Sequence, residues 1–256
     1  MTLLRALHAE VLKLKRTTAL KMVVISPAVV VLLILFMTSQ APFSMVHPNT
    51  VRNEWMRLAH VNLRFWALLV MPLLITLETA LVAELDHSEN HWKSLLARPV
   101  PRWTLYVAKL LVVVAMTAAA TFLLLCGVLL DGTILPKLQS EIAFGFPVPL
   151  GAIFREGAQV MALVFLALAI QHWVSLRWKS FSVAVGTGIV ALAVSFFALA
   201  AARQVGSWPQ YFPWVLPMMV LAEQPQNIET GLAISGALGL VVAAAGCCDF
   251  CRREVQ

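Results

Sequence analysis

Charged residues are scarce in this sequence. They make up 12% of the 256 residues, against 60% hydrophobic residues, and the mean hydropathy is +0.83. A soluble domain carries about a quarter charged residues and about half apolar ones. The composition therefore excludes a soluble globular protein, and the apolar runs leave no room for a separate soluble domain.

The short motifs of several enzyme classes are also missing. The sequence has no H-E-x-x-H, no G-x-S-x-G, and no lysine that follows a glycine as a Walker A loop requires. Only His172 of the six histidines lies clearly within an apolar run, so a bis-histidine haem would lack its ligands. We expect this chain to hold no catalytic residues, no metal and no cofactor, and to hydrolyse no ATP by a Walker A site.

Cysteine is sparse, with four residues. Cys126 lies inside an apolar run and Cys247 lies near the C-terminus, a distribution that does not suggest a disulfide framework. Cys248 and Cys251 have C-x-x-C spacing, but no second pair and no nearby histidine completes a zinc site. Reduced cytosolic thiols are the preferred interpretation, and metal or redox chemistry is the alternative.

Long apolar runs are what the sequence contains in quantity. Each is long enough to cross the hydrocarbon core of a bilayer as a helix, which takes about 20 residues. They predict an all-α polytopic membrane protein in which residues 1–256 form one transmembrane domain. The six predicted spans are approximately 22–37, 63–83, 104–130, 157–175, 181–202 and 230–247.

The basic residues predict the orientation of these helices. Thirteen of the 19 Lys and Arg residues lie on one side of the predicted membrane and six on the other, and basic residues are retained on the cytoplasmic side. Both termini are therefore expected in the cytoplasm, and the net charge of +6 requires no nucleic-acid partner. A cleaved signal peptide over residues 1–41 is an alternative, although its basic region would be unusually long.

The N-terminal segment has helical periodicity. Apolar residues recur at three- and four-residue steps while basic residues occupy other faces, which predicts an amphipathic interfacial helix along the membrane surface. Its basic side would meet anionic headgroups or a cytosolic partner. A simple anchoring helix is the alternative. The apolar set is Leu4, Leu7, Val11 and Leu14, and the basic set is Arg5, Lys13 and Arg16.

An outer connection, Gly206 to Pro217, is rich in aromatic residues and proline. The apolar patch that follows, Met218 to Ala222, is too short to cross a membrane, so the whole segment suits the interface. Its aromatic side chains predict either an outer gate for cargo or an ordinary aromatic belt. They are Trp208, Tyr211, Phe212 and Trp214.

Glu78 is the one carboxylate well inside a predicted span. An ionisable group there is costly enough to suggest a function. Glu78 also lies only about five residues from the cytoplasmic end of its span, roughly 8 Å deep. Snorkelling, or pairing with a basic residue such as Lys109, is therefore an equally supported interpretation.

The connection between the second and third spans predicts a short amphipathic helix. Ser88 can cap it, and Pro99 ends it before the next span begins at Arg102. Trp92, Leu95 and Leu96 would line one side. The pattern fits a solvated loop with one apolar side or a docking site for a soluble partner.

The same connection carries a specific run of motifs. An acidic start is followed by Asn90-His-Trp-Lys-Ser-Leu-Leu96, Pro99-Val-Pro-Arg102 and Tyr106-Val-Ala-Lys109, with supporting segments at Ala9–Arg16 and Gln171–Phe181. On these residues the chain resembles the permease subunits of type-2 ABC exporters, in particular the group that contains lantibiotic-immunity permeases.

The resemblance implies a six-helix half-transporter in the inner membrane of a bacterium. It would work with an ABC ATPase in two copies, which bind ATP and Mg, and would face a second permease, identical or related, around a central path. Glu84 to Leu96 would be a coupling helix that enters a groove on the ATPase. The residues assigned to ATPase coupling are Glu84, Asp86, Glu89, His91, Trp92, Leu95 and Leu96.

Together these observations predict a permease that couples ATP hydrolysis by a separate subunit to the export or membrane expulsion of an amphipathic substrate, such as a lantibiotic-like peptide. A non-transporting sensor or assembly scaffold that docks a cytosolic partner is the alternative. A secondary transporter is less well supported, because the spans show no internal repeat and only Glu78 offers a buried ion-coupling group.

Overall fold

The computed structural model describes residues 3–15, 17–40, 53–87, 101–139, 144–145, 147–178, 180–206, 208–222 and 227–252. All regular secondary structure in these ranges is helical, and six helices are long and apolar enough to cross a membrane. The predicted all-α polytopic fold is confirmed. The elements are α1 (Leu3–Leu14), α2 (Thr18–Gln40), α4 (Glu54–Phe65), η1 (Trp66–Val70), α5 (Met71–His87), α7 (Arg102–Leu138), α8 (Leu150–Arg177), α9 (Phe181–Val205), η2 (Trp208–Tyr211), η3 (Leu216–Leu221) and α10 (Ile228–Arg252).

The lengths of the spans differ from the prediction. Every span-forming helix extends beyond its predicted apolar range, and the fifth, α9, does so least, since it begins at Phe181 as predicted and ends at Val205. Apolarity marks only the part of a helix that lies in hydrocarbon, whereas the helices continue where polar side chains face protein or water. The largest extensions are at the start of the second span, Glu54, and at the end of the third, Leu138.

The second span consists of three joined pieces, α4, η1 and α5. Asn53 caps its start, because the Asn53 side chain accepts a hydrogen bond of 2.9 Å from the backbone N–H of Trp55. The amphipathic α4 buries Trp55 and Leu58 while it also carries Arg57 and Arg64. These charges lower its mean hydropathy, so apolarity alone missed it. One π-helical turn, η1, joins α4 to α5.

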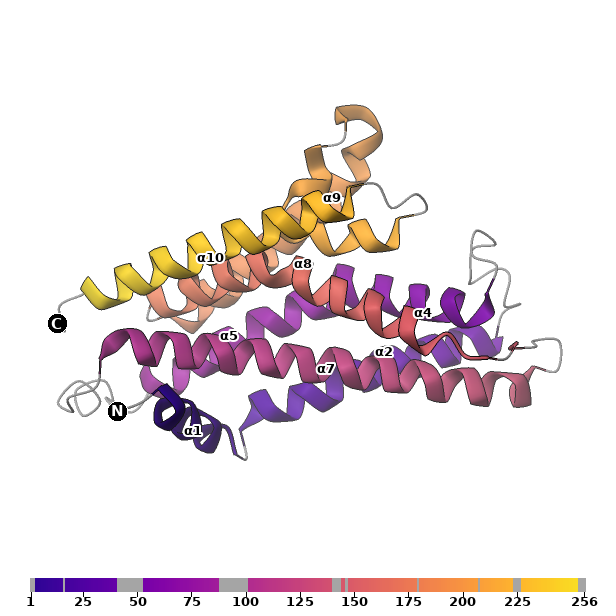
Figure 1. Ribbon diagram of the computed structural model, residues 1–256, viewed down its shortest axis with the longest axis horizontal. Helices are drawn as coiled ribbons and strands as arrows, with labels where there is room; N and C mark the ends of the chain where they lie inside the picture. The colour runs from indigo at the N-terminus through magenta and orange to yellow at the C-terminus, as the bar shows by residue number, and fades with distance from the viewer. Residues whose placement is uncertain are drawn as a thin grey trace.

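The helices form an elongated bundle with two distinct ends. α1, the beginning of α7 and the end of α10 lie at one end, which we call the α1 end, and α7 runs the length of the molecule (Figure 1). α7 contacts α1, α2 and α8, while α8 also packs on α10 and α5. Motion at the start of α7 therefore has a direct mechanical route to the opposite end.

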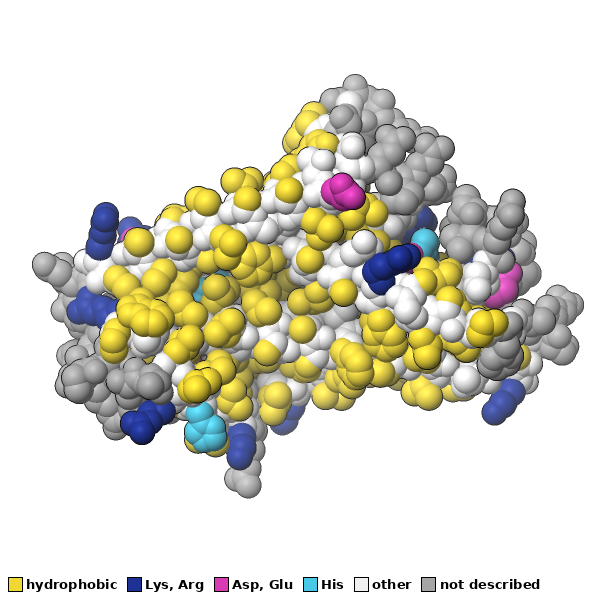
Figure 2. Space-filling model, viewed as in Figure 1, with side chains coloured by type: hydrophobic (Ala, Val, Ile, Leu, Met, Phe, Trp, Pro, Cys, Tyr) yellow, Lys and Arg dark blue, Asp and Glu magenta, His cyan; other side chains and the backbone are white. Residues whose placement is uncertain are grey.

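Much of the outer surface is apolar. Figure 2 shows hydrophobic side chains over most of one face, with Lys and Arg mostly toward the α1 end. Such a surface suits hydrocarbon, since water would not tolerate this much exposed apolar area on a soluble protein. The exposed apolar side chains on α2, α9 and α10 include Val24, Ile25, Leu32, Phe36, Ile189, Val190, Phe197, Leu240 and Val241.

Close packing between α5 and α9 generates a stability prediction. A Cβ atom at Gly188 on α9 would overlap the side chain of Thr76 on α5, whereas one at Gly186 would meet nothing within 4 Å. Small residues let membrane helices approach closely, and overpacking costs about 1–3 kcal/mol. Gly188→Val should lower the thermal midpoint in detergent well below that of the matched Gly186→Val. Equal midpoints for the two variants would contradict this packing.

Candidate functional site

The N-terminal helix α1 packs directly on α7 at the α1 end. It buries Ala6, Glu10 and Leu14. The predicted apolar face is therefore divided: Leu14 faces the bundle, whereas Leu4 and Val11 are exposed. One side of α1 therefore packs on α7, a contact that the prediction of an interfacial helix along the membrane surface did not include.

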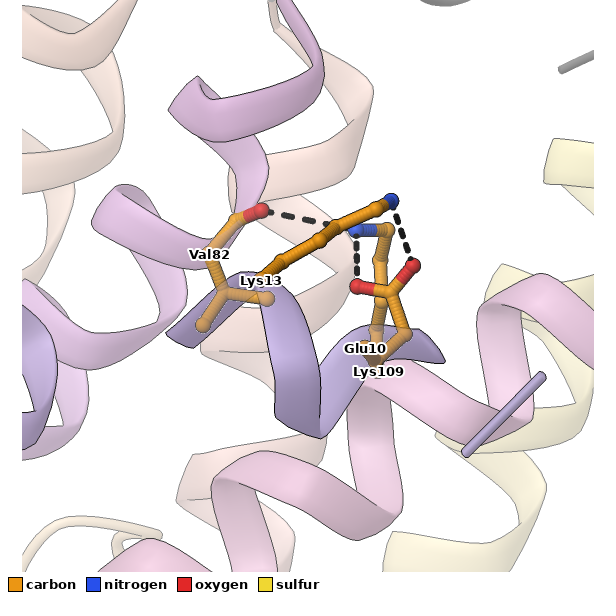
Figure 3. A network of polar contacts seen from close by, with 4 residues as sticks. All are labelled: Glu10, Lys13, Val82 and Lys109. Carbon is orange, nitrogen blue, oxygen red and sulfur yellow. Dashed lines mark hydrogen bonds and ion pairs between the residues drawn. The ribbon is translucent and has the colours of Figure 1, made fainter. Parts of the chain in front are cut away.

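A buried ion pair holds this contact. The ammonium of Lys109 on α7 lies 2.8 Å from Glu10 Oε2, and the ammonium of Lys13 lies 2.7 Å from Glu10 Oε1 (Figure 3). The side chains of Lys109 and Glu10 are only 1% and 5% exposed. Lys109 also donates a hydrogen bond of 3.5 Å to the backbone carbonyl of Val82 on α5. Three helices, α1, α5 and α7, thus meet at one ammonium group.

The Glu10–Lys109 pair lies beside the connection between the second and third spans. Val82 lies near the end of α5 and Lys109 lies near the start of α7, so both flank the connection predicted to dock the ATPase. Glu10 joins the N-terminal helix to the same point. A force applied to the connection would reach α1, α5 and α7 together.

The predicted coupling helix is corrected at its start. α5 continues through His87, so Glu84 and Asp86 belong to the last turns of α5 and not to a separate helix. No proline or glycine interrupts the chain there, and nothing ends the helix at Ala83. Glu84 is half-buried. The other predicted coupling residues, Glu89, His91, Trp92, Leu95 and Leu96, lie outside the described residues.

Glu78 lies in a polar row between α5 and α7. Its side chain is fully buried, and the Thr117 hydroxyl donates a hydrogen bond of 2.9 Å to Glu78 Oε2. Glu78 Oε1 has no hydrogen-bond partner in the described part of the chain. Complete burial excludes snorkelling, and among the described residues Lys109 forms an ion pair with Glu10.

The row continues away from the α1 end. The Thr121 hydroxyl donates to the Thr117 carbonyl at 2.9 Å, and the indole N–H of Trp66 donates to the Thr121 hydroxyl at 3.1 Å. On another side of α5, the Ser175 hydroxyl of α8 donates to Thr79 at 3.0 Å. Sequence reasoning missed these partners, since a threonine or serine within an apolar run carries no signal of what it faces.

A second buried polar contact lies between α7 and α8. The ring of His172 packs edge-on against the ring of Tyr106, with 4.8 Å between centroids. Both residues are 1% exposed, and His172 Nε2 and the Tyr106 hydroxyl have no hydrogen-bond partner among the described residues. In those residues no group of three or more His, Cys, Asp or Glu side chains is arranged to hold a metal ion.

The aromatic outer segment is not uniform. Trp208 is 58% exposed, whereas Trp214 is buried, and Tyr211 and Phe212 are half-buried. The apolar patch predicted for the interface forms most of η3, which packs on α8 inside the bundle. The Arg64 guanidinium of α4 donates two hydrogen bonds, of 2.6 and 3.0 Å, to the Leu221 carbonyl at the end of η3. The segment thus has an exposed aromatic part at Trp208 and a buried apolar part at η3.

These features define a polytopic membrane protein whose N-terminal helix is fastened beside a predicted docking connection. The chain belongs to the ABC-2 family: the family described as ABC-2 family transporter protein matches residues 6–201, from α1 to the end of the fifth span. It is therefore a permease subunit of an ABC transporter, which works with an ABC ATPase subunit. No curated protein and no solved structure matches the chain.

The buried pair predicts a large effect of losing one charge. Glu10→Gln removes the carboxylate that lies 2.8 Å from the buried Lys109 ammonium, and breaking a buried pair from one side costs about 3–5 kcal/mol. The thermal midpoint in detergent should fall markedly. Glu10→Leu combined with Lys109→Met removes both charges and should recover most of the loss. Glu229→Gln, at an exposed acid of α10, is the control, and an equal effect of Glu229→Gln and Glu10→Gln would contradict the prediction.

Glu78 allows a test that separates structure from function. A buried carboxyl with one hydrogen bond contributes little stability, so Glu78→Leu with Thr117→Val should unfold within about 1 kcal/mol of the wild type. A functional carboxyl would nevertheless be needed for ATP-driven activity of the assembled transporter. Thermal unfolding and substrate-stimulated ATP hydrolysis measure the two effects. A loss of stability above about 2 kcal/mol with normal activity would make Glu78 a structural residue.

Proposed function

We propose that this chain is the membrane subunit of an exporter that expels an amphipathic substrate, of the lantibiotic-like peptide class, with energy from ATP hydrolysed by a separate ABC ATPase. The proposal of mechanical coupling to the ATPase rests on the buried Glu10–Lys109 pair. Lys109 contacts α1 and α5 beside the connection between the second and third spans. An exporter needs such a joint, because force from the ATPase must move several helices together.

The orientation follows from charge. Among the described residues, the α1 end carries Arg5, Lys13, Lys15, Lys21 and Arg177, and basic residues are retained in the cytoplasm. We therefore assign the α1 end and both termini to the cytoplasmic side of a bacterial inner membrane. The ATPase would then reach the connection at residues 88–100 directly.

The proposed mechanism is mechanical. ATP and Mg bind to two ATPase copies, and their closure moves the segment that contains His91, Trp92, Leu95 and Leu96. α5 ends where that segment begins and α7 starts where it ends, so both helices receive the motion. Lys109 passes it to α1 through Glu10. Nucleotide can bias the permease only through a difference in ATPase affinity between its two conformations.

The substrate path would form between two permeases, identical or related. An amphipathic peptide enters from the outer leaflet in this proposal and leaves outward. The exposed Trp208 and the half-buried Tyr211 and Phe212 follow the end of α9, on the outer side in this orientation, and offer aromatic contacts there. Amphipathic rings favour the headgroup level. The buried Trp214 would support this segment from inside.

Trp92 provides the test of the proposed function. Truncating an aromatic anchor costs about 2 kcal/mol or more, which weakens association roughly thirty-fold. Trp92→Ala should insert normally but lose the copurifying Walker A-containing ATPase, or hydrolyse ATP without export. Trp208→Ala, at an exposed tryptophan that follows α9 on the proposed outer side, should retain the ATPase.

Two results would count against the proposal. Normal ATPase retention and normal export by Trp92→Ala would move the docking surface elsewhere. A purified complex that hydrolyses ATP but expels no amphipathic peptide from proteoliposomes would favour a sensor or scaffold.

A further inference from the structure

The outward side of α1 and of Lys15, which follows it, carries no acidic side chain. Glu10 is the one acidic residue among residues 1–53, and the structure buries it against Lys109. Arg5, His8 and Lys15 lie on the exposed side of the helix. At 1.5 Å per residue, Arg5 and Lys15 are separated by about 15 Å along the helix axis. The buried pair thus keeps the one acidic side chain of α1 away from its outward side.

Apolar side chains interleave with this basic side. Leu4 is 74% exposed and Val11 is 49% exposed, and both point away from the bundle beside the basic residues. The exposed surface of α2 continues with Leu20 and Val24. Because α2 is a span, its exposed apolar side chains face hydrocarbon, and α1 joins it through a short turn in which Thr17 donates a hydrogen bond to the Leu14 carbonyl.

Two exposed tryptophans lie at the α1 end and indicate where the membrane interface lies. Trp103 is the second residue of α7 and Trp178 directly follows α8, and they are 49% and 48% exposed. Tryptophan is enriched where a membrane meets water. α1 contacts the same part of α7, through Lys109, so its basic side chains lie near headgroup depth.

We infer that α1 binds the headgroups of anionic phospholipids, with Arg5 and Lys15 as the main charge contacts and Leu4 and Val11 inserted toward the acyl chains. A basic helix with an apolar flank is the arrangement that favours anionic lipid over a soluble polyanion, which would gain nothing from the apolar residues. The inference rests on the position of α1 and holds whatever the chain transports. Lipid binding would also restrict the movement of α7, since the Glu10–Lys109 ion pair links α1 to α7.

The test uses the purified full chain in a zwitterionic detergent, with phosphatidylglycerol or phosphatidylcholine added and bound lipids counted by native mass spectrometry. Phosphatidylglycerol should be retained preferentially, and added salt should weaken its binding. Each removed basic residue should weaken binding about five-fold. Arg5→Gln with Lys15→Gln should therefore bind roughly twenty- to thirty-fold more weakly, while Arg5→Lys with Lys15→Arg should bind normally.

Lys137→Gln with Arg155→Gln is the matched control, because these exposed basic residues lie at the opposite end. It should leave phosphatidylglycerol binding unchanged. An unchanged preference in the Arg5 and Lys15 glutamine variant would overturn the inference. Loss of the ATPase from that variant with unchanged lipid binding would also overturn it, since α1 would then be a protein interface.

Discussion

The structure depends on a carboxylate and an ammonium that have both been removed from water. Glu10 and Lys109 compensate each other's burial, because a charge that leaves water is costly in a low-dielectric environment unless an opposite charge lies beside it. This requirement fixes where α1 lies and which side it presents to the bundle. It also fixes α1 to α7, the helix that runs from one end of the molecule to the other.

Hydrogen bonds farther along α7 extend the same constraint. Trp66 and Glu78 of the second span bond to Thr121 and Thr117 of the third. In hydrocarbon, polar groups find no water as an alternative partner, so these bonds favour one register between the two helices. The spans on either side of the predicted docking connection are therefore linked at several depths, which suits helices that must transmit a displacement.

Apolarity and charge were sufficient to predict six spans, because a bilayer imposes the same length requirement on each helix. They could not predict the helix ends, since α4, for example, is stabilised by its Asn53 cap and by the burial of Trp55 and Leu58. The surroundings of Glu78 could not be predicted either, because its hydrogen-bond partner, Thr117, lies 39 residues away in the sequence. The buried apolar η3 was missed because its environment is supplied by α8 and α10, which the local sequence does not reveal.

The Glu10–Lys109 pair could not be found from periodicity either, because its members are 99 residues apart. Two signals were nonetheless present. Glu10 is the one acid in the first 53 residues, and Lys109 lies inside an apolar run. A buried lysine needs an anionic partner or a neutral form. These signals did not select the contact, because the sequence offered Glu78 as another carboxylate for Lys109, and only the structure places Glu10 beside it.

The π-helical turn at Trp66–Val70 has a consequence for how the second span can vary. A π turn accommodates one residue more than an α-helical turn, so it offsets the angular phase of α4 from that of α5 by about 100°. This offset lets Arg64 point toward the Leu221 carbonyl while Glu78 points toward Thr117. A single-residue deletion within the turn would restore regular α-helix and rotate every side chain of α4 about the axis. The number of residues in this span is therefore constrained, although its apolar composition alone would allow a span one residue shorter.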